Sequence, residues 1–120
     1  VEEYRGEWMS SDTINVADTV LADTTENPNQ LRVYGLAEFI TTRWRETWIN
    51  GDGSCIMELI CNEKIEIERQ WIGDTDYPDR YEIQGSGTID TTSNTIQLSY
   101  DIFYSEGAGS KHVSTILNME

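Results

Sequence analysis

The sequence has few basic residues, two cysteines, one histidine and no long hydrophobic segment. Its longest apolar runs are two or three residues, whereas a transmembrane helix needs roughly 18, so we expect no membrane insertion. Eight Lys and Arg stand against 22 Asp and Glu, which gives a formal net charge of −14. This charge repels phosphate backbones and anionic lipid headgroups, so nucleic acid and membrane surfaces are not expected partners.

Metal-binding and redox side chains are equally scarce. Zinc is held by four Cys, His or carboxylate ligands, and with His112 as the single histidine no zinc site is expected. Cys55 and Cys61 lie in a segment with no Gly, Pro or Asn at which to turn. In one strand their Cα atoms would be about 20 Å apart, against a limit of about 7 Å for a disulfide. We therefore expect two free, buried thiols; a disulfide would require a sharp bulge.

The chain nevertheless contains enough apolar surface to fold. Hydrophobic residues make up 38% of the 120 residues and aromatic residues 10%, too much for an intrinsically disordered chain. A chain of this length buries roughly two thirds of the surface that its unfolded form exposes. One domain spanning residues 1–120 is expected.

Apolar and polar residues alternate along the second half of the chain, which predicts β-strands. Residues 80–90 and 95–104 both show this period of two, with a turn at 92–94 between them, and predict a hairpin. Gly85 and Gly87 fall on the apolar, inward face of the first of these strands. At such positions a missing side chain lets a strand bend or lets another chain pack close.

The same reasoning predicts the other strands. Segments 55–61 and 65–71 form a second predicted hairpin, and 112–119 is the closing strand. Segment 40–49 is a further predicted strand, with Ile40, Trp44 and Trp48 on one face, and the turn at 50–53 joins it to 55–61. The strands predicted before it are 4–8, 13–21 and 31–36. A short helix at 36–41 is an alternative. Seven or eight strands at this spacing predict an all-β, antiparallel meander. About eight strands would close into a small barrel, and the alternative is a seven-stranded β-sandwich.

Two motifs resemble those of a known family. The segment Tyr4–Trp8 contains Gly-x-Trp, which resembles the first-strand motif of lipocalins and other calycins. Residues 81–90 and 94–100 are similar to a hairpin of small lipocalin-like domains in secreted or lipid-anchored proteins of Bacteroidetes-type bacteria. The resemblance implies a small barrel in which Trp8 plugs the closed end. The chain is shorter than true lipocalins, and this difference argues against a large ligand cavity.

The same resemblance implies an exported bacterial protein, periplasmic or on the cell surface. The chain begins at Val1 and no hydrophobic signal segment precedes the first predicted strand. We expect any export signal, or a lipid-anchored N-terminus, to have been removed.

No convergent catalytic site is visible in the sequence. The alternation places His112 on the solvent face, and neither cysteine has a base nearby in the sequence. Glu46 and Arg69 are out of place on apolar faces, and a buried pair between them would satisfy both charges. We expect that the chain is not an enzyme and that it needs no cofactor.

Two further groups of residues are candidate binding sites. The carboxylates Asp74, Asp76 and Asp79 could bind a calcium ion, although the segment lacks the glycine and terminal Glu of an EF-hand, and an ordinary acidic loop is the favoured interpretation. Aromatic residues on apolar faces usually form the core, but similar residues line ligand pockets. The residues that we predict to bind a ligand are Trp44, Trp48, Trp71, Tyr100 and Arg69.

Three functions are compatible with these observations. The favoured one is a non-catalytic binding or interaction module with a small apolar ligand or a protein partner. The alternatives are a secreted calycin-type protease inhibitor and a hydrolase that uses carboxylates in the barrel mouth. A continuous cavity lined by Trp44, Trp48 and Trp71 would favour ligand binding, whereas a filled interior would move the function to the surface.

Overall fold

The computed structural model describes residues 2–12, 14–61, 63–104 and 109–119. Its strands are β1 (Gly6–Ser10), β2 (Thr19–Thr24), β3 (Gln30–Tyr34), β4 (Trp48–Gly51), β5 (Cys55–Ile60), β6 (Lys64–Thr75), β7 (Arg80–Asp90), β8 (Thr95–Tyr104) and β9 (Gly109–Asn118). A 3-10 turn, η1 (Glu2–Tyr4), precedes β1, and a short helix, α1 (Glu38–Thr42), lies between β3 and β4. No helix in these ranges is both long and apolar enough to cross a bilayer.

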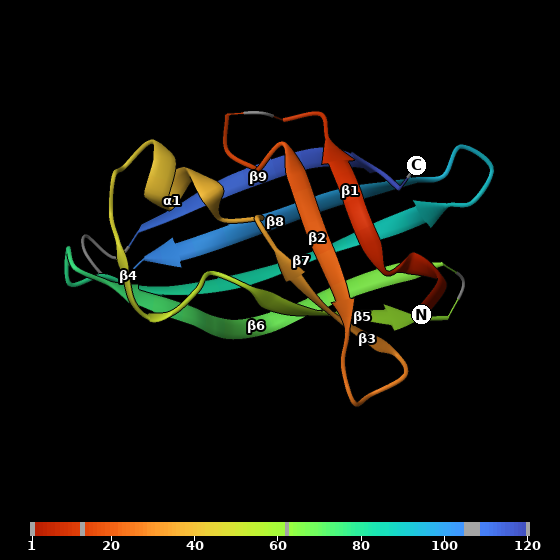
Figure 1. Cartoon of the computed structure of the whole chain (residues 1–120), viewed down its shortest axis with the longest axis horizontal. Helices are drawn as coiled ribbons and strands as arrows, with labels where there is room; N and C mark the ends of the chain where they lie inside the picture. Colours follow the sequence, from red (N-terminus) through yellow and green to blue (C-terminus); the bar gives the residue numbers. More distant parts are fainter. Residues whose placement is uncertain (1, 13, 62, 105–108, 120) are drawn as a thin grey trace.

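Eight of the strands close into a barrel (Figure 1). Each of β1, β2, β3, β5, β6, β7, β8 and β9 pairs antiparallel with the next, and β9 returns to pair with β1 through Met9 opposite Asn118 and Ser10 opposite Leu117. The additional strand β4 pairs with the end of β6. The prediction of an antiparallel meander closed into a small barrel is confirmed, and the alternative of a seven-stranded sandwich is wrong.

The β7–β8 hairpin has the predicted register and facing. Asp90 lies opposite Thr95, and the pairing continues without a shift to Tyr81 opposite Tyr104. A Cβ added to Gly85 would collide with the Cβ of Tyr100, and one added to Gly87 would collide with the backbone oxygen of Gln97. Glycine at both positions therefore lets β8 approach β7 closely, as expected.

The predicted strand at 40–49 is wrong. Residues 38–42 form α1, which buries Phe39 and Ile40, and only 48–51 is extended. The spacing of four residues that placed Ile40, Trp44 and Trp48 on one strand face is equally a helical spacing. The expected hairpin through 50–53 is also wrong, because β4 pairs with β6 rather than with β5.

Two irregularities in β6 change its facing along the strand. Ile67 pairs with Gly85, but the next register pair is Gln70 with Ile83, so β6 has one residue more than β7 in this interval. Because a single extra residue turns the side chains after it to the other face, Ile72 is buried and Trp71 is 41% exposed. A second extra residue between Trp71 and Gly73 restores the original phase, and Thr75 is again buried.

The interior of the barrel is packed with side chains. Buried residues from all parts of the sheet form one cluster, whose largest members are Trp8, Tyr81, Tyr100 and Phe39. Trp8, in the Gly-x-Trp motif, is 1% exposed and donates its indole N–H to the carbonyl oxygen of Tyr4 at 2.9 Å. The core therefore fills the space that a lipocalin-type ligand would occupy.

The two cysteines do not form a disulfide, as predicted from their spacing. Cys55 is buried in β5, and burial raises the pKa of its thiol to about 12. Cys61 follows the end of β5 and is exposed, so the expectation that both thiols are buried is wrong for Cys61.

Candidate functional site

An aromatic cluster lies at the end of the barrel that carries α1 and β4 (Figure 1). Trp44 packs edge-on against Phe39 and Tyr104, with ring centroids 4.9 and 5.4 Å apart, and Trp48 packs edge-on against Tyr81 at 5.8 Å. Trp44 is 39% exposed. The cluster covers this end of the core and brings together two of the predicted ligand-binding residues.

Buried polar groups lie beneath this cluster. Glu46 is 8% exposed, and its Oε1 accepts hydrogen bonds from the Thr75 hydroxyl at 2.6 Å and from the Tyr81 hydroxyl at 2.8 Å. The Tyr81 hydroxyl is also 3.2 Å from a carboxylate oxygen of Asp79, which is 4% exposed. Burial and the neighbouring Glu46 carboxylate raise the pKa of Tyr81 well above its usual range. These groups are satisfied by one another and hold the loops after α1 and β6 against the barrel.

The ion pair between Glu46 and Arg69 that the sequence raised as a possibility does not form. Arg69 lies on the outer face, where its Nε donates to Glu82 at 2.8 Å and its guanidinium lies 3.9 Å from the centroid of the Phe103 ring. The β6 bulge is the physical reason, because it turns Arg69 away from the interior.

The five predicted ligand-binding residues do not converge on one cavity. Trp44 and Trp48 belong to the aromatic cluster, whereas Trp71 and Arg69 lie on the outside. Tyr100 is buried, with its hydroxyl donating to the carbonyl oxygen of Leu36 at 2.6 Å. A common pocket of Trp44, Trp48 and Trp71 is therefore absent from the described residues.

The three carboxylates of the candidate calcium site have separate partners. Asp74 accepts from the indole N–H of Trp71 at 3.0 Å, Asp76 accepts from the backbone N–H of Thr47 at 2.9 Å, and Asp79 faces Tyr81. Among the residues that the structure describes, no three His, Cys, Asp or Glu side chains gather as a metal site. The segment is a structural connection between β4, β6 and β7.

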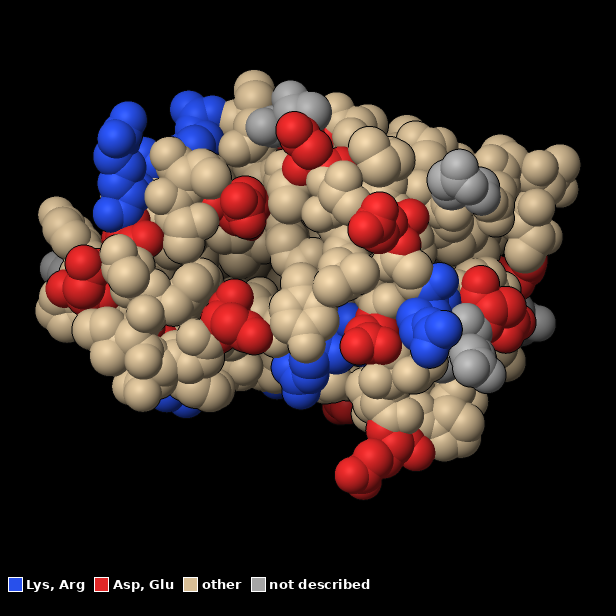
Figure 2. Space-filling view, in the orientation of Figure 1, with Lys and Arg blue, Asp and Glu red and all other residues tan. Residues whose placement is uncertain are grey.

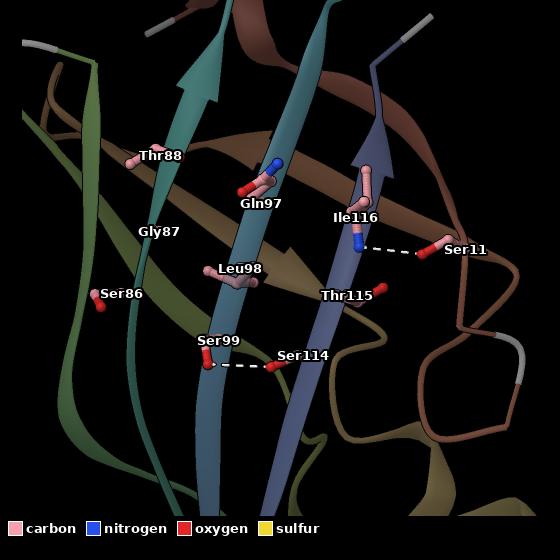
Figure 3. Close-up of a pocket in the computed structure, with 10 residues that line it drawn as sticks. All are labelled: Ser11, Ser86, Gly87, Thr88, Gln97, Leu98, Ser99, Ser114, Thr115 and Ile116. Carbon is pink, nitrogen blue, oxygen red and sulfur yellow. Dashed lines mark hydrogen bonds between the residues drawn. The ribbon is translucent and has the colours of Figure 1, made fainter.

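A groove of about 630 Å³ crosses the outer face of β7, β8 and β9 (Figure 3). Its lining consists of Ser11, Ser86, Gly87, Thr88, Gln97, Leu98, Ser99, Ser114, Thr115 and Ile116. Register pairing places outward side chains in two rows across the strands, one formed by Ser86, Ser99 and Ser114, and the other by Thr88, Gln97 and Ile116. The small side chains of the first row leave the outer surface hollow.

None of the ten lining residues is charged, although the whole chain carries a net charge of −14. Figure 2 shows the face that carries β1 and β2, on which acidic side chains are spread widely and basic side chains lie at several places among them. The groove is therefore a neutral strip on an acidic molecule, lined mostly by hydroxyl groups and one amide that both donate and accept hydrogen bonds.

A hydrogen-bonded network adjoins the groove. His112 Nδ1 is 2.9 Å from Asp101 Oδ1, and its Nε2 is 3.1 Å from Ser99 Oγ and 3.2 Å from Ser114 Oγ. The two serine hydroxyls are 3.2 Å apart. Asp101 and His112 are register partners, as are Ser99 and Ser114, so the β8–β9 ladder itself assembles the network.

The sequence placed His112 correctly on the solvent face but did not indicate its partners. In the alternation of 95–104, Asp101 and Ser99 also fall on the polar face. Their partners on β9 depend on the register between β8 and β9, which the sequence does not fix because the connecting residues 105–108 do not match a turn type of defined length. That connection lies outside the described residues.

A scan against protein-family models, a search of the curated proteins and a search of the solved structures each found no match to this chain. A functional proposal therefore rests on the geometry of the barrel and of its surface.

Proposed function

We propose that this chain is a binding module that holds a neutral, hydroxyl-rich ligand, such as a glycan, in the groove across β7, β8 and β9. The observation that carries the proposal is the uncharged, hydrogen-bonding lining of the groove on a chain with a net charge of −14. Hydroxyl and amide side chains can donate hydrogen bonds to sugar hydroxyls and accept hydrogen bonds from them. Because none of the lining residues is charged, the groove favours a neutral ligand over a cation or an anion.

The filled core supports a site on the surface. Because buried side chains occupy the barrel interior, a small apolar ligand would have to displace them, whereas the outer groove needs no rearrangement. Ser99 and Ser114 are already held by His112, which reduces the conformational entropy that these side chains lose on binding.

The proposal includes the setting that the lipocalin-like resemblance implies: an exported protein of Bacteroidetes-type bacteria, acting in the periplasm or at the cell surface. The closed antiparallel barrel and the buried Trp8 are compatible with that resemblance. The calycin-type inhibitor is less favoured because η1 and Trp8 are joined by a hydrogen bond and pack on the barrel, rather than forming an arm.

Binding of neutral oligosaccharides, first on an array and then by calorimetry, tests this function. Gln97→Arg puts a long charged side chain into the groove and should weaken binding at least tenfold. Thr92→Arg makes the same change of charge in the β7–β8 turn, outside the groove, and should bind like the unchanged protein. Failure of all neutral glycans to bind, or equal binding by the two variants, would refute the proposed function.

A further inference from the structure

The network beside the groove contains a nucleophile, a base and an orienting carboxylate in contact. Asp101 can only accept a hydrogen bond when ionised, so the proton of a neutral imidazole lies on Nδ1 of His112, where it is donated to Asp101 over 2.9 Å. Nε2 then carries the lone pair, and it faces the hydroxyl of Ser99 at 3.1 Å. A Ser-His-Asp relay is recognised by this geometry, whatever the fold or the order in the chain.

We propose that Asp101 and His112 activate Ser99 as a nucleophile that transfers acyl groups from esters of neutral alcohols. This activity goes beyond the proposed binding function and does not depend on it. The sequence showed no nucleophile beside His112, because Ser99 is 13 residues away in the chain and becomes its neighbour only in the sheet.

The reaction is balanced without any further reagent. Ser99 Oγ attacks the ester carbonyl carbon while its proton moves to His112 Nε2. The bond to the alcohol oxygen breaks, and the departing alcohol takes that proton, which leaves the acyl group on Ser99. Water then attacks the acyl carbon with His112 again as the base, which releases the acid and restores the Ser99 hydroxyl.

The hydroxyl of Ser114 is the group placed to stabilise the oxyanion. It is 3.2 Å from Ser99 Oγ and projects from the same outer face. The backbone around Ser99 is paired with β7 through Ser86 and with β9 through Ser114, so it offers no pair of free N–H donors. Loss of one donor from an oxyanion hole slows acyl transfer by about 100- to 1,000-fold. We therefore expect slow turnover, restricted to esters with a good leaving group.

The site is open to a substrate. The side chains of His112 and Asp101 are 60% and 43% exposed, and Ser99 lines the neutral groove. An ester can thus approach Ser99 from solvent along the groove, and the uncharged lining favours a neutral alcohol portion.

Labelling with an alkyl fluorophosphonate tests the proposal, because this probe phosphonylates activated serines and bypasses slow deacylation. Intact-mass measurement should show one adduct on the full chain, and peptide mapping should place it on Ser99. His112→Ala should slow labelling about 100-fold or more, since general-base catalysis contributes at least that factor. Asp101→Asn should give an intermediate rate.

Ser93 provides a matched control outside the groove. Ser93→Ala removes an exposed hydroxyl from the β7–β8 turn that is bonded to Thr95 and not to His112, so the labelling rate should not change. In the unchanged protein, Ser93 is exposed and its hydroxyl is 2.8 Å from that of Thr95. It shows how the probe reacts with a serine that no histidine activates, and it should stay unlabelled. Far-UV circular dichroism establishes that each variant is folded. Absence of an adduct, an adduct on Ser114 or Ser93, or an unchanged rate in folded His112→Ala would overturn the proposal.

Discussion

At the scale of single residues, Glu46 is the buried acceptor that joins two parts of the barrel, since Thr75 on β6 and Tyr81 on β7 both donate to it. Its position in phase with Trp44 and Trp48 left its environment open in the sequence, and in the structure it is buried. Its hydrogen-bond donors, Thr75 and Tyr81, lie 29 and 35 residues further along the chain, on β6 and β7. Only the folded topology brings them together, so the sequence suggested a charged partner where the structure has two hydroxyls.

The Tyr81 hydroxyl should matter for stability because it faces two buried carboxylates. We expect Tyr81→Phe to lower the free energy of unfolding by about 1–3 kcal/mol, the usual cost of leaving a buried acceptor without its donor. Denaturant unfolding of the variant gives this value directly. Tyr77→Phe is the control, since Tyr77 is 63% exposed and the free energy of unfolding should not depend on a hydroxyl in contact with solvent. Equal stability of Tyr81→Phe and the unchanged protein would show that Glu46 and Asp79 do not need this donor.

At the scale of elements, alternation predicted the strands that have no irregularity and failed where the chain departs from regular geometry. The β7–β8 hairpin follows strict period two and has the expected register over its whole length. In β6 the alternation is correct up to Ile67, and the bulge that follows moves Arg69 and Trp71 to the outside before a second irregularity at 71–73 restores the phase. A bulge changes the phase by one residue and leaves no local sequence signature, so two of the five predicted ligand residues were misplaced.

The facing of β7 can be tested with two adjacent valine substitutions. Gly87→Val should lower the free energy of unfolding by about 3 kcal/mol, the upper end for overpacking, because the new Cβ would meet the backbone oxygen of Gln97. Thr88→Val, on the exposed face, should change it by no more than ~0.5 kcal/mol. Denaturant midpoints at equal m-value measure both. If Thr88→Val were the more damaging, the strand would face the other way.

At the scale of the whole molecule, the number of strands and their hairpin connections were sufficient to predict a closed barrel. The place of the candidate site was not predictable, since it depends on how much of the interior the side chains fill. Trp8, Tyr81 and Tyr100 together occupy the space that a ligand cavity would need. The hollow lies instead on the outside, where the serine row leaves little side-chain volume above the sheet.

The central claim is that this barrel binds on its outer face and not in its interior. Chemical-shift mapping by NMR, during titration with a neutral oligosaccharide selected on the array, tests it most directly. We predict shifts confined to the amides of the groove, above all those of Ser86, Gln97, Ser99 and Ser114, with the interior methyl groups of Ile83, Ile102 and Val113 unchanged. Shifts concentrated on those interior methyl groups, with the groove amides unaffected, would contradict the account.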